Sequence, residues 1–257
     1  MNIKNNLATT EDQSLEQAYQ KYQLLKQEVE LWQQERGAYW VEQFRLADNP
    51  PYLAISELPA QAVIELWQKL NQAAGVPVAD PDLREIWERL KNGQNVNELD
   101  AEISARLQMA ISGAAQLASE MVKEQKLPTE SSKSSDYPPG GFICPVCGEV
   151  PTLAVLTPPN GARVMHCLSC DFEWPVKRVG CLFCGSQDTK QQMFLKNEKF
   201  PGIEMAVCQL CGQYFKEIDA REKVATDYRW EDLRTLPLNF ATELWFSEQA
   251  KKNNQMN

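Results

Sequence analysis

The chain has 257 residues, of which 43% are hydrophobic and 24% are charged, and its formal net charge is −9. This composition is typical of a globular protein with one large or two modest domains. No apolar stretch approaches 20 residues, so we expect no membrane-spanning helix. The acidic balance argues against a nucleic-acid partner, because domains that bind nucleic acids usually carry a basic face.

The first half of the chain has the apolar periodicity of amphipathic helices. Hydrophobic residues recur at steps of three and four, which places them along one face of a helix. Four such stripes occur, at residues 15–32, 63–74, 83–90 and 96–121. Gly75 and Pro77 end the second stripe, and Asn97 is a candidate N-cap for the fourth. We therefore predict a helical domain over residues 1–126, with the stripes as its core.

Residues 127–141 differ from the segments on either side. They are rich in Ser, Pro and Gly and lack apolar periodicity, which is a pattern that indicates a linker. We expect the boundary between the helical domain and the rest of the chain to lie in this segment.

All eight cysteines of the chain fall in four Cys-x-x-Cys pairs. The turn within each pair presents two sulfurs, and two such turns complete a tetrahedral shell around a metal ion. The spacing therefore predicts two tetrathiolate metal sites. In chain order, the ligand sets are Cys144, Cys147, Cys167 and Cys170 for the first site and Cys181, Cys184, Cys208 and Cys211 for the second. A cross-braced pairing, first pair with third and second with fourth, stays open.

The two sites have the pattern of a repeated unit. Each unit has about 40 residues, near the size below which a chain usually needs a metal or another cross-link to fold alone. The residue that follows the second cysteine is one that tolerates positive φ: Gly148, Asp171, Gly185 and Gly212. We predict two tetracysteine modules, at residues 142–180 and 181–220.

Other uses of paired cysteines fit the chain less well. Disulfides are typical of secreted domains, but residues 1–10 lack the apolar core of a secretory signal. We therefore expect reduced thiols and a cytoplasmic protein. Dithiol catalysis does not require four pairs at regular spacing. An iron–sulfur cluster also uses four cysteine thiolates and stays open, and zinc and iron both accept such a ligand set.

Residues 221–257 are predicted to form one or two helices that pack back on the rest of the protein. Pro237 is expected to end the first helix and Asn239 to cap the second, with a frayed tail at residues 253–257. Three basic residues near the cysteines either offset the charge of the thiolate centres or are solvated surface charges: Arg163, Arg178 and Lys216. His166 is not needed as a ligand beside two complete sets of four cysteines.

The order and spacing of the motifs across residues 140–245 resemble a known family. The motifs are Cys144-Pro-Val-Cys147-Gly148-x-x-Pro151, Arg163-x-x-His166-Cys167-x-x-Cys170-x-x-Glu173-Trp174, Arg178-Val179-x-Cys181-x-x-Cys184, Cys208-x-x-Cys211-x-x-Tyr214-x-Lys216 and Glu231-Asp232-Leu233-x-x-Leu236-Pro237-Leu238. This set resembles the formate dehydrogenase accessory proteins of the FdhE type.

The resemblance implies an α plus small β fold. An N-terminal helical bundle would be followed by two tandem rubredoxin-like or zinc-ribbon modules and a C-terminal helical segment. The eight cysteines would bind two metal ions, with iron favoured by the family and zinc possible.

The resemblance also implies a function. The protein would be a cytoplasmic accessory protein, not an enzyme. It would bind the catalytic subunit of a molybdenum- or tungsten-dependent formate dehydrogenase and be required for its maturation. A rubredoxin-like electron-transfer or thiol-redox factor and a zinc-ribbon nucleic-acid adaptor are the alternatives.

Overall fold

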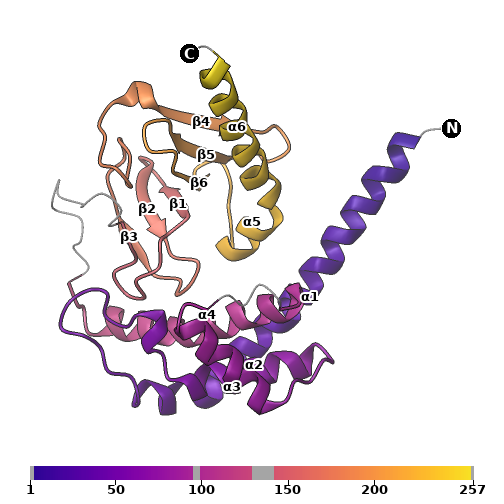
Figure 1. Ribbon diagram of the computed structural model, residues 1–257, viewed down its shortest axis with the longest axis vertical. Helices are drawn as coiled ribbons and strands as arrows, with labels where there is room; N and C mark the ends of the chain where they lie inside the picture. Colours follow the sequence, from indigo (N-terminus) through magenta and orange to yellow (C-terminus); the bar gives the residue numbers. More distant parts are fainter. Residues whose placement is uncertain (1–2, 95–98, 129–141, 256–257) are drawn as a thin grey trace. The chain divides into compact units, whose positions relative to one another are not determined.

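The computed structural model describes residues 3–94, 99–128 and 142–255, apart from the side chains of residues 3–12 and 252–255. The chain forms two compact units (Figure 1). One comprises Met1–Leu127 with Val146–Gly148, and the other comprises Pro128–Pro145 with Glu149–Asn257. Most of the segment predicted as a linker, residues 129–141, lies outside the described residues.

The first unit is helical. Its elements in the described residues are α1 (Ile3–Val41), the short 3-10 helix η1 (Ile55–Glu57), α2 (Ala60–Ala73), α3 (Asp80–Lys91) and α4 (Ala101–Glu124). Helix α4 packs against α1 and α2, and α3 packs against α2. The N-terminal part of α1 projects beyond the other helices of the unit (Figure 1). Trp32, Trp67 and Trp87 are fully buried, so these parts of the apolar stripes form the core of this unit, whereas Leu15 and Tyr19 at the start of the first stripe are exposed.

Asp100 caps the N-terminus of α4. Its carboxylate accepts hydrogen bonds from the backbone N–H groups of Glu102 and Ile103, at 2.9 and 3.3 Å. It takes the role predicted for Asn97, which lies outside the described residues. The helix therefore begins several residues later than the apolar pattern indicates.

The second unit is built around one sheet. Its strands are β1 (Leu153–Thr157), β2 (Ala162–His166), β3 (Glu173–Pro175), β4 (Gln192–Lys196), β5 (Ile203–Cys208) and β6 (Tyr214–Asp219), with the 3-10 helix η2 (Thr189–Gln191) before β4. The spatial order is β3-β2-β1-β6-β5-β4. Each tetracysteine segment contributes three antiparallel strands, and the parallel pairing of β1 with β6 joins the two sets.

Two helices complete the second unit, α5 (Tyr228–Arg234) and α6 (Leu236–Gln255). Leu238 of α6 joins the core cluster of the sheet, and Trp245 and Phe246 pack against that cluster. The prediction that Pro237 ends the first helix is wrong. Pro237 lies in the first turn of α6, where the missing N–H has no partner to lose. Asn239 lies inside α6 rather than at its cap, and the helix continues to Gln255, past the start of the predicted tail.

Candidate metal centres

The four Cys-x-x-Cys pairs form turns with the same backbone pattern. In each three-stranded set, one pair precedes the first strand and one lies between the second and third strands. In each turn the N–H of the first cysteine donates to the carbonyl five residues later: Cys144 to Glu149 (2.8 Å), Cys167 to Phe172 (2.9 Å), Cys181 to Ser186 (2.8 Å) and Cys208 to Gln213 (3.0 Å). The residue after the second cysteine has positive φ in every turn: Gly148 (78°), Asp171 (55°), Gly185 (72°) and Gly212 (70°).

The turns bring the cysteines together in two sets of four. The sets are Cys144, Cys147, Cys167 and Cys170, and Cys181, Cys184, Cys208 and Cys211. Within each set the sulfurs all lie within 4.8 Å of one another. The structure thus groups the cysteines in chain order and not in the cross-braced arrangement.

The separations between sulfurs suit a tetrahedral metal ion. Three pairs of Sγ atoms are close: Cys144 and Cys170 at 3.6 Å, Cys181 and Cys211 at 3.7 Å, and Cys184 and Cys208 at 3.9 Å. Tetrahedral bonds of about 2.3 Å to sulfur place neighbouring sulfurs about 3.8 Å apart. A disulfide bond would place them about 2.05 Å apart, and none of the eight cysteines forms a disulfide. Each set could therefore hold one metal ion.

Hydrogen-bond donors point at the sulfurs of the second set. The N–H of Cys184 lies 3.5 Å from Cys181 Sγ, and the side-chain amide Nε2 of Gln192 lies 3.5 Å from Cys208 Sγ. Burial raises the pKa of Cys208, but N–H groups of Cys211 and Leu210 and the Gln192 amide outweigh this effect and lower the pKa to about 7. Such donors favour the thiolate, which is the form that binds a metal.

His166 lies beside the first set without belonging to it. Its Nδ1 is 3.1 Å from Glu173 Oε1, and its Nε2 is 3.6 Å from Asp171 Oδ1. Burial lowers the pKa of His166, but the two carboxylates outweigh burial and raise the pKa to about 9. The side chain is therefore held between two carboxylates and does not face the four sulfurs as a ligand.

Two of the basic residues expected near the thiolates form ion pairs within the second unit instead. Arg163 Nε donates to Glu217 Oε2 at 2.7 Å, and Lys216 Nζ donates to Asp232 Oδ1 at 2.6 Å. Arg163 and Lys216 are both buried. The alternative that they are solvated surface charges is wrong, because each is buried with a carboxylate partner.

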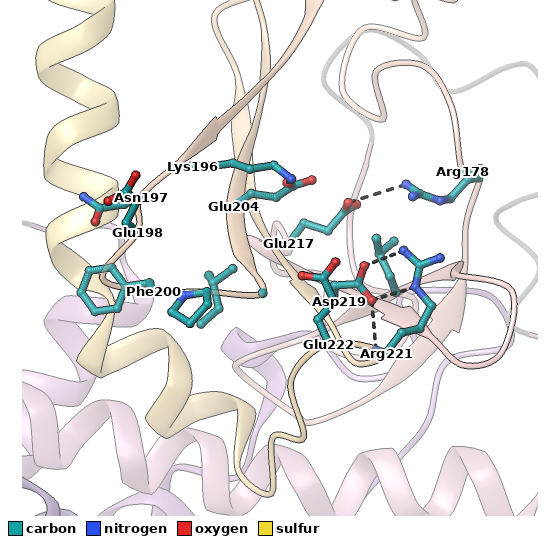
Figure 2. A pocket seen from close by; sticks show the side chains of 14 residues that line it. Arg178, Lys196, Asn197, Glu198, Phe200, Glu204, Glu217, Asp219, Arg221 and Glu222 are labelled. Carbon is teal, nitrogen blue, oxygen red and sulfur yellow. Dashed lines mark hydrogen bonds and ion pairs between the residues drawn. The ribbon is translucent and has the colours of Figure 1, made fainter.

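The second unit has a cavity of about 440 Å³, lined by the ends of β4 to β6 and by the loop after β6. Figure 2 shows the side chains that line it. Three ion pairs lie along its lining: Lys196 with Glu204 at 2.8 Å, Arg178 with Glu217 at 3.6 Å and Arg221 Nε with Asp219 Oδ1 at 2.8 Å. Glu198 and Glu222 also line it. We assign no ligand to this cavity, because most of its charged side chains already pair with one another.

Gln192 and Arg229 contact the candidate centres, and sequence reasoning did not find them. Arg229 Nη2 donates to the carbonyl of Leu168 and to Asp171 Oδ1 in the second turn of the first set. Neither residue belongs to a cysteine motif. Arg229 lies 58 residues after Asp171, so only the folded chain brings the two together.

The central segment of the chain matches a family model. Residues 143–178 match the model described as FdhE, central domain. None of the helices in the described part of the chain combines the length and the apolar content that a membrane crossing requires.

Curated relatives carry the same family name. An FdhE homolog from Edwardsiella ictaluri is 31% identical over 111 residues, which cover 42% of this chain and 36% of that protein. An FdhE homolog from Aquifex aeolicus is 29% identical over 110 residues, which cover 42% of this chain and 38% of that protein. The matches thus span little more than a third of the length of these relatives.

A solved structure has the same fold. The crystal structure of the FdhE protein from Pseudomonas aeruginosa superposes with a TM-score of 0.55 and 20% sequence identity, over 81% of this chain and 74% of that chain. Together with the six-stranded sheet and the two cysteine sets, this match confirms the α plus β fold with ribbon-like modules.

Proposed function

We propose, on the premise that this chain resembles the FdhE proteins in motifs, family model and fold, that it is an accessory protein for formate dehydrogenase. In this proposal the chain acts in the cytoplasm. It binds the catalytic subunit of a molybdenum- or tungsten-dependent formate dehydrogenase and is required for that subunit to become active. The chain itself carries out no reaction.

The eight cysteines are the proposed metal ligands. What supports this assignment is their grouping into two sets whose close sulfur–sulfur distances, 3.6 to 3.9 Å, suit one tetrahedral ion each. A metal bound there would cross-link the turns that flank each set of strands and stabilise modules too small to bury a large core. Iron is the metal favoured by the resemblance, and zinc fits the same ligands.

The observation that carries the proposal is the combination of two complete cysteine sets with the match of residues 143–178 to the FdhE central domain. A single cysteine set occurs in many unrelated proteins, whereas two sets on one sheet within this family are more specific. In the proposed organisation, residues 1–126 form the helical domain, and residues 142–180 and 181–220 form the two metal modules.

An affinity pull-down from native cytoplasm under anaerobic conditions, read by mass spectrometry, tests the proposed partner. The wild-type chain should recover a formate dehydrogenase catalytic subunit. A Cys144→Ser/Cys147→Ser variant should lose one metal equivalent and bind the subunit less. A Lys190→Ala variant, which changes an exposed residue outside the cysteine sets, should bind like the wild type. Recovery of nucleic acid or a redox protein, without a dehydrogenase, would contradict the proposal.

A rubredoxin-like electron carrier is the second candidate. The observation that favours it is the partial exposure of Cys184 and Cys211 in the second set, because electron transfer requires a partner to approach the metal closely. The iron-loaded chain would then show a visible charge-transfer spectrum that bleaches with a physiological reductant and returns on oxidation. A spectrum that does not cycle would remove this candidate.

A further inference from the structure

The two cysteine sets differ in their exposure to solvent. The first set is closed, because each of its four cysteines is at most 1% exposed. In the second set, Cys181 and Cys208 are buried, but Cys184 and Cys211 are partly exposed. One cysteine from each turn of the second set is therefore partly exposed to solvent.

The difference begins with what covers the second turn of each set. The turn that carries Cys167 and Cys170 is held by α5. Arg229 donates to the Leu168 carbonyl and to Asp171 Oδ1, the second at 3.1 Å. The ring of Tyr228 lies 5.0 Å from that of His166, and Leu168 packs against the core cluster of the sheet. Helix α5 thus closes this side of the first set.

The equivalent turn of the second set, which carries Cys208 and Cys211, is open. Gln209, which takes the position of the packed Leu168 of the first set, is exposed, and Leu210 beside it is 64% exposed. A Cβ atom built on Gly185 or Gly212 would meet no atom within 4 Å. Both sharp turns around the second set therefore face open space.

Exposure of this kind controls how fast a thiolate-bound metal leaves. An incoming ligand must reach the metal while one cysteine sulfur departs as a thiolate, and no electron changes hands in the exchange. Groups that surround the ligands hinder this approach and hold each sulfur in place. A closed set therefore releases its ion slowly, and an open set releases its ion quickly.

We propose that the second set is an exchangeable metal site, which passes its ion to and from soft external ligands such as thiolates, and that the first set is a permanent structural site. Cys184 and Cys211 are the sulfurs that detach, and Arg229 is a positioning residue that keeps the first site closed. The proposal rests on the ligand sets proposed above. It predicts that external metal ligands react with the second site and not with the first.

Metal release from the full-length chain tests this division. The chain is loaded with zinc, its metal content is measured, and it is mixed with the chromogenic chelator 4-(2-pyridylazo)resorcinol in a stopped-flow instrument. The zinc should leave in two phases of one equivalent each, whose rates differ by about tenfold or more, the effect typical of losing groups around a metal site. A Cys184→Ser/Cys211→Ser variant should lose the fast phase and keep the slow one.

Arg229→Ala tests the role of α5. This variant should speed the slow phase by about tenfold and leave the fast phase unchanged. Arg234→Ala is the matched control, because Arg234 is on the same helix but pairs with Glu231, three residues away. It should leave both phases unchanged. The unchanged fast phase in Arg229→Ala also shows that the second site remains folded.

Each result separates this inference from the proposals on which it rests. Fewer than two zinc equivalents per chain would contradict the ligand sets. Two equivalents that leave in a single phase, or a slow phase lost in Cys184→Ser/Cys211→Ser, would overturn the division between the sites. Failure to recover a dehydrogenase in the pull-down would contradict the proposed partner. It would not change what the release kinetics say about the two sites.

Discussion

Removing one member of the buried ion pair between Arg163 and Glu217 should destabilise the sheet more than removing both. Arg163 is on β2 and Glu217 is on β6, so their hydrogen bond of 2.7 Å spans β1 and ties the two sets of strands together. The side chains are 3% and 1% exposed. Burial is the largest cause of the pKa shift of each group, and it lowers the pKa of Arg163 and raises that of Glu217.

The expected cost follows from this burial. Arg163→Met would leave the buried Glu217 carboxylate without its main partner, and breaking a buried pair in this way costs about 3–5 kcal/mol. Arg163→Met/Glu217→Met removes both charges while keeping similar volume, so it should cost no more than about 1 kcal/mol. Arg178, which lies 3.6 Å from Glu217, is 45% exposed and can turn into solvent in the double variant.

Native-state hydrogen exchange measured by mass spectrometry reports the opening free energy of β1 and β6 separately from the rest of the chain. As a control, Lys196→Met breaks the pair with Glu204, in which the lysine side chain is 76% exposed. That change should cost less than about 1 kcal/mol. A double variant as unstable as Arg163→Met would refute the reasoning, because the cost would then not come from an unpaired charge.

Two further predictions concern the helical unit. Gly113→Ala should destabilise it by about 1–3 kcal/mol, because the new Cβ would lie 2.6 Å from Leu66 Cδ2. Urea unfolding should show a larger loss of unfolding free energy than for Gly37→Ala, whose nearest contact is 3.2 Å. A gain in stability would contradict this packing. Burial raises the pKa of Glu65, but hydrogen bonds, that from Arg36 first, outweigh burial and hold the pKa below 4.5. The unit should therefore be most stable above pH 4.5 and lose this contribution as the pH falls through the lowered pKa. A Glu65→Gln variant should show a flatter acid dependence of thermal unfolding, and an unchanged dependence would contradict the assignment.

Local patterns in the sequence predicted the cysteine turns and the helices. The spacing within a Cys-x-x-Cys pair and the residue after it determine a turn by themselves, so the turns and the positive φ values at Gly148, Asp171, Gly185 and Gly212 follow from short segments. Which turns share a set depends on the sheet, and the sequence left the chain-order and cross-braced pairings open. The helical stripes are equally local. Their ends are less well determined, because capping depends on one side chain, as the role of Asp100 shows.

Features that depend on distant parts of the chain could not be predicted. The burial of Arg163 could not be predicted, because its partner, Glu217, is 54 residues away in the sequence. The parallel pairing of β1 with β6 has no local signal, since each strand also has an antiparallel neighbour within its own set. Pro237 was misassigned because proline ends one helix and begins another equally well.

The parallel pair at the centre of the sheet also sets a delay during synthesis on the ribosome. Leu153 of β1 lies beside Lys216 of β6, which is made about 60 residues later. At about 5–20 residues per second, β1 waits roughly 3–12 s for this neighbour. Until then, one side of an apolar strand presents its N–H and C=O groups to any other extended chain nearby. The speed of translation between these two strands therefore helps to determine how much of the protein reaches its native sheet before it aggregates.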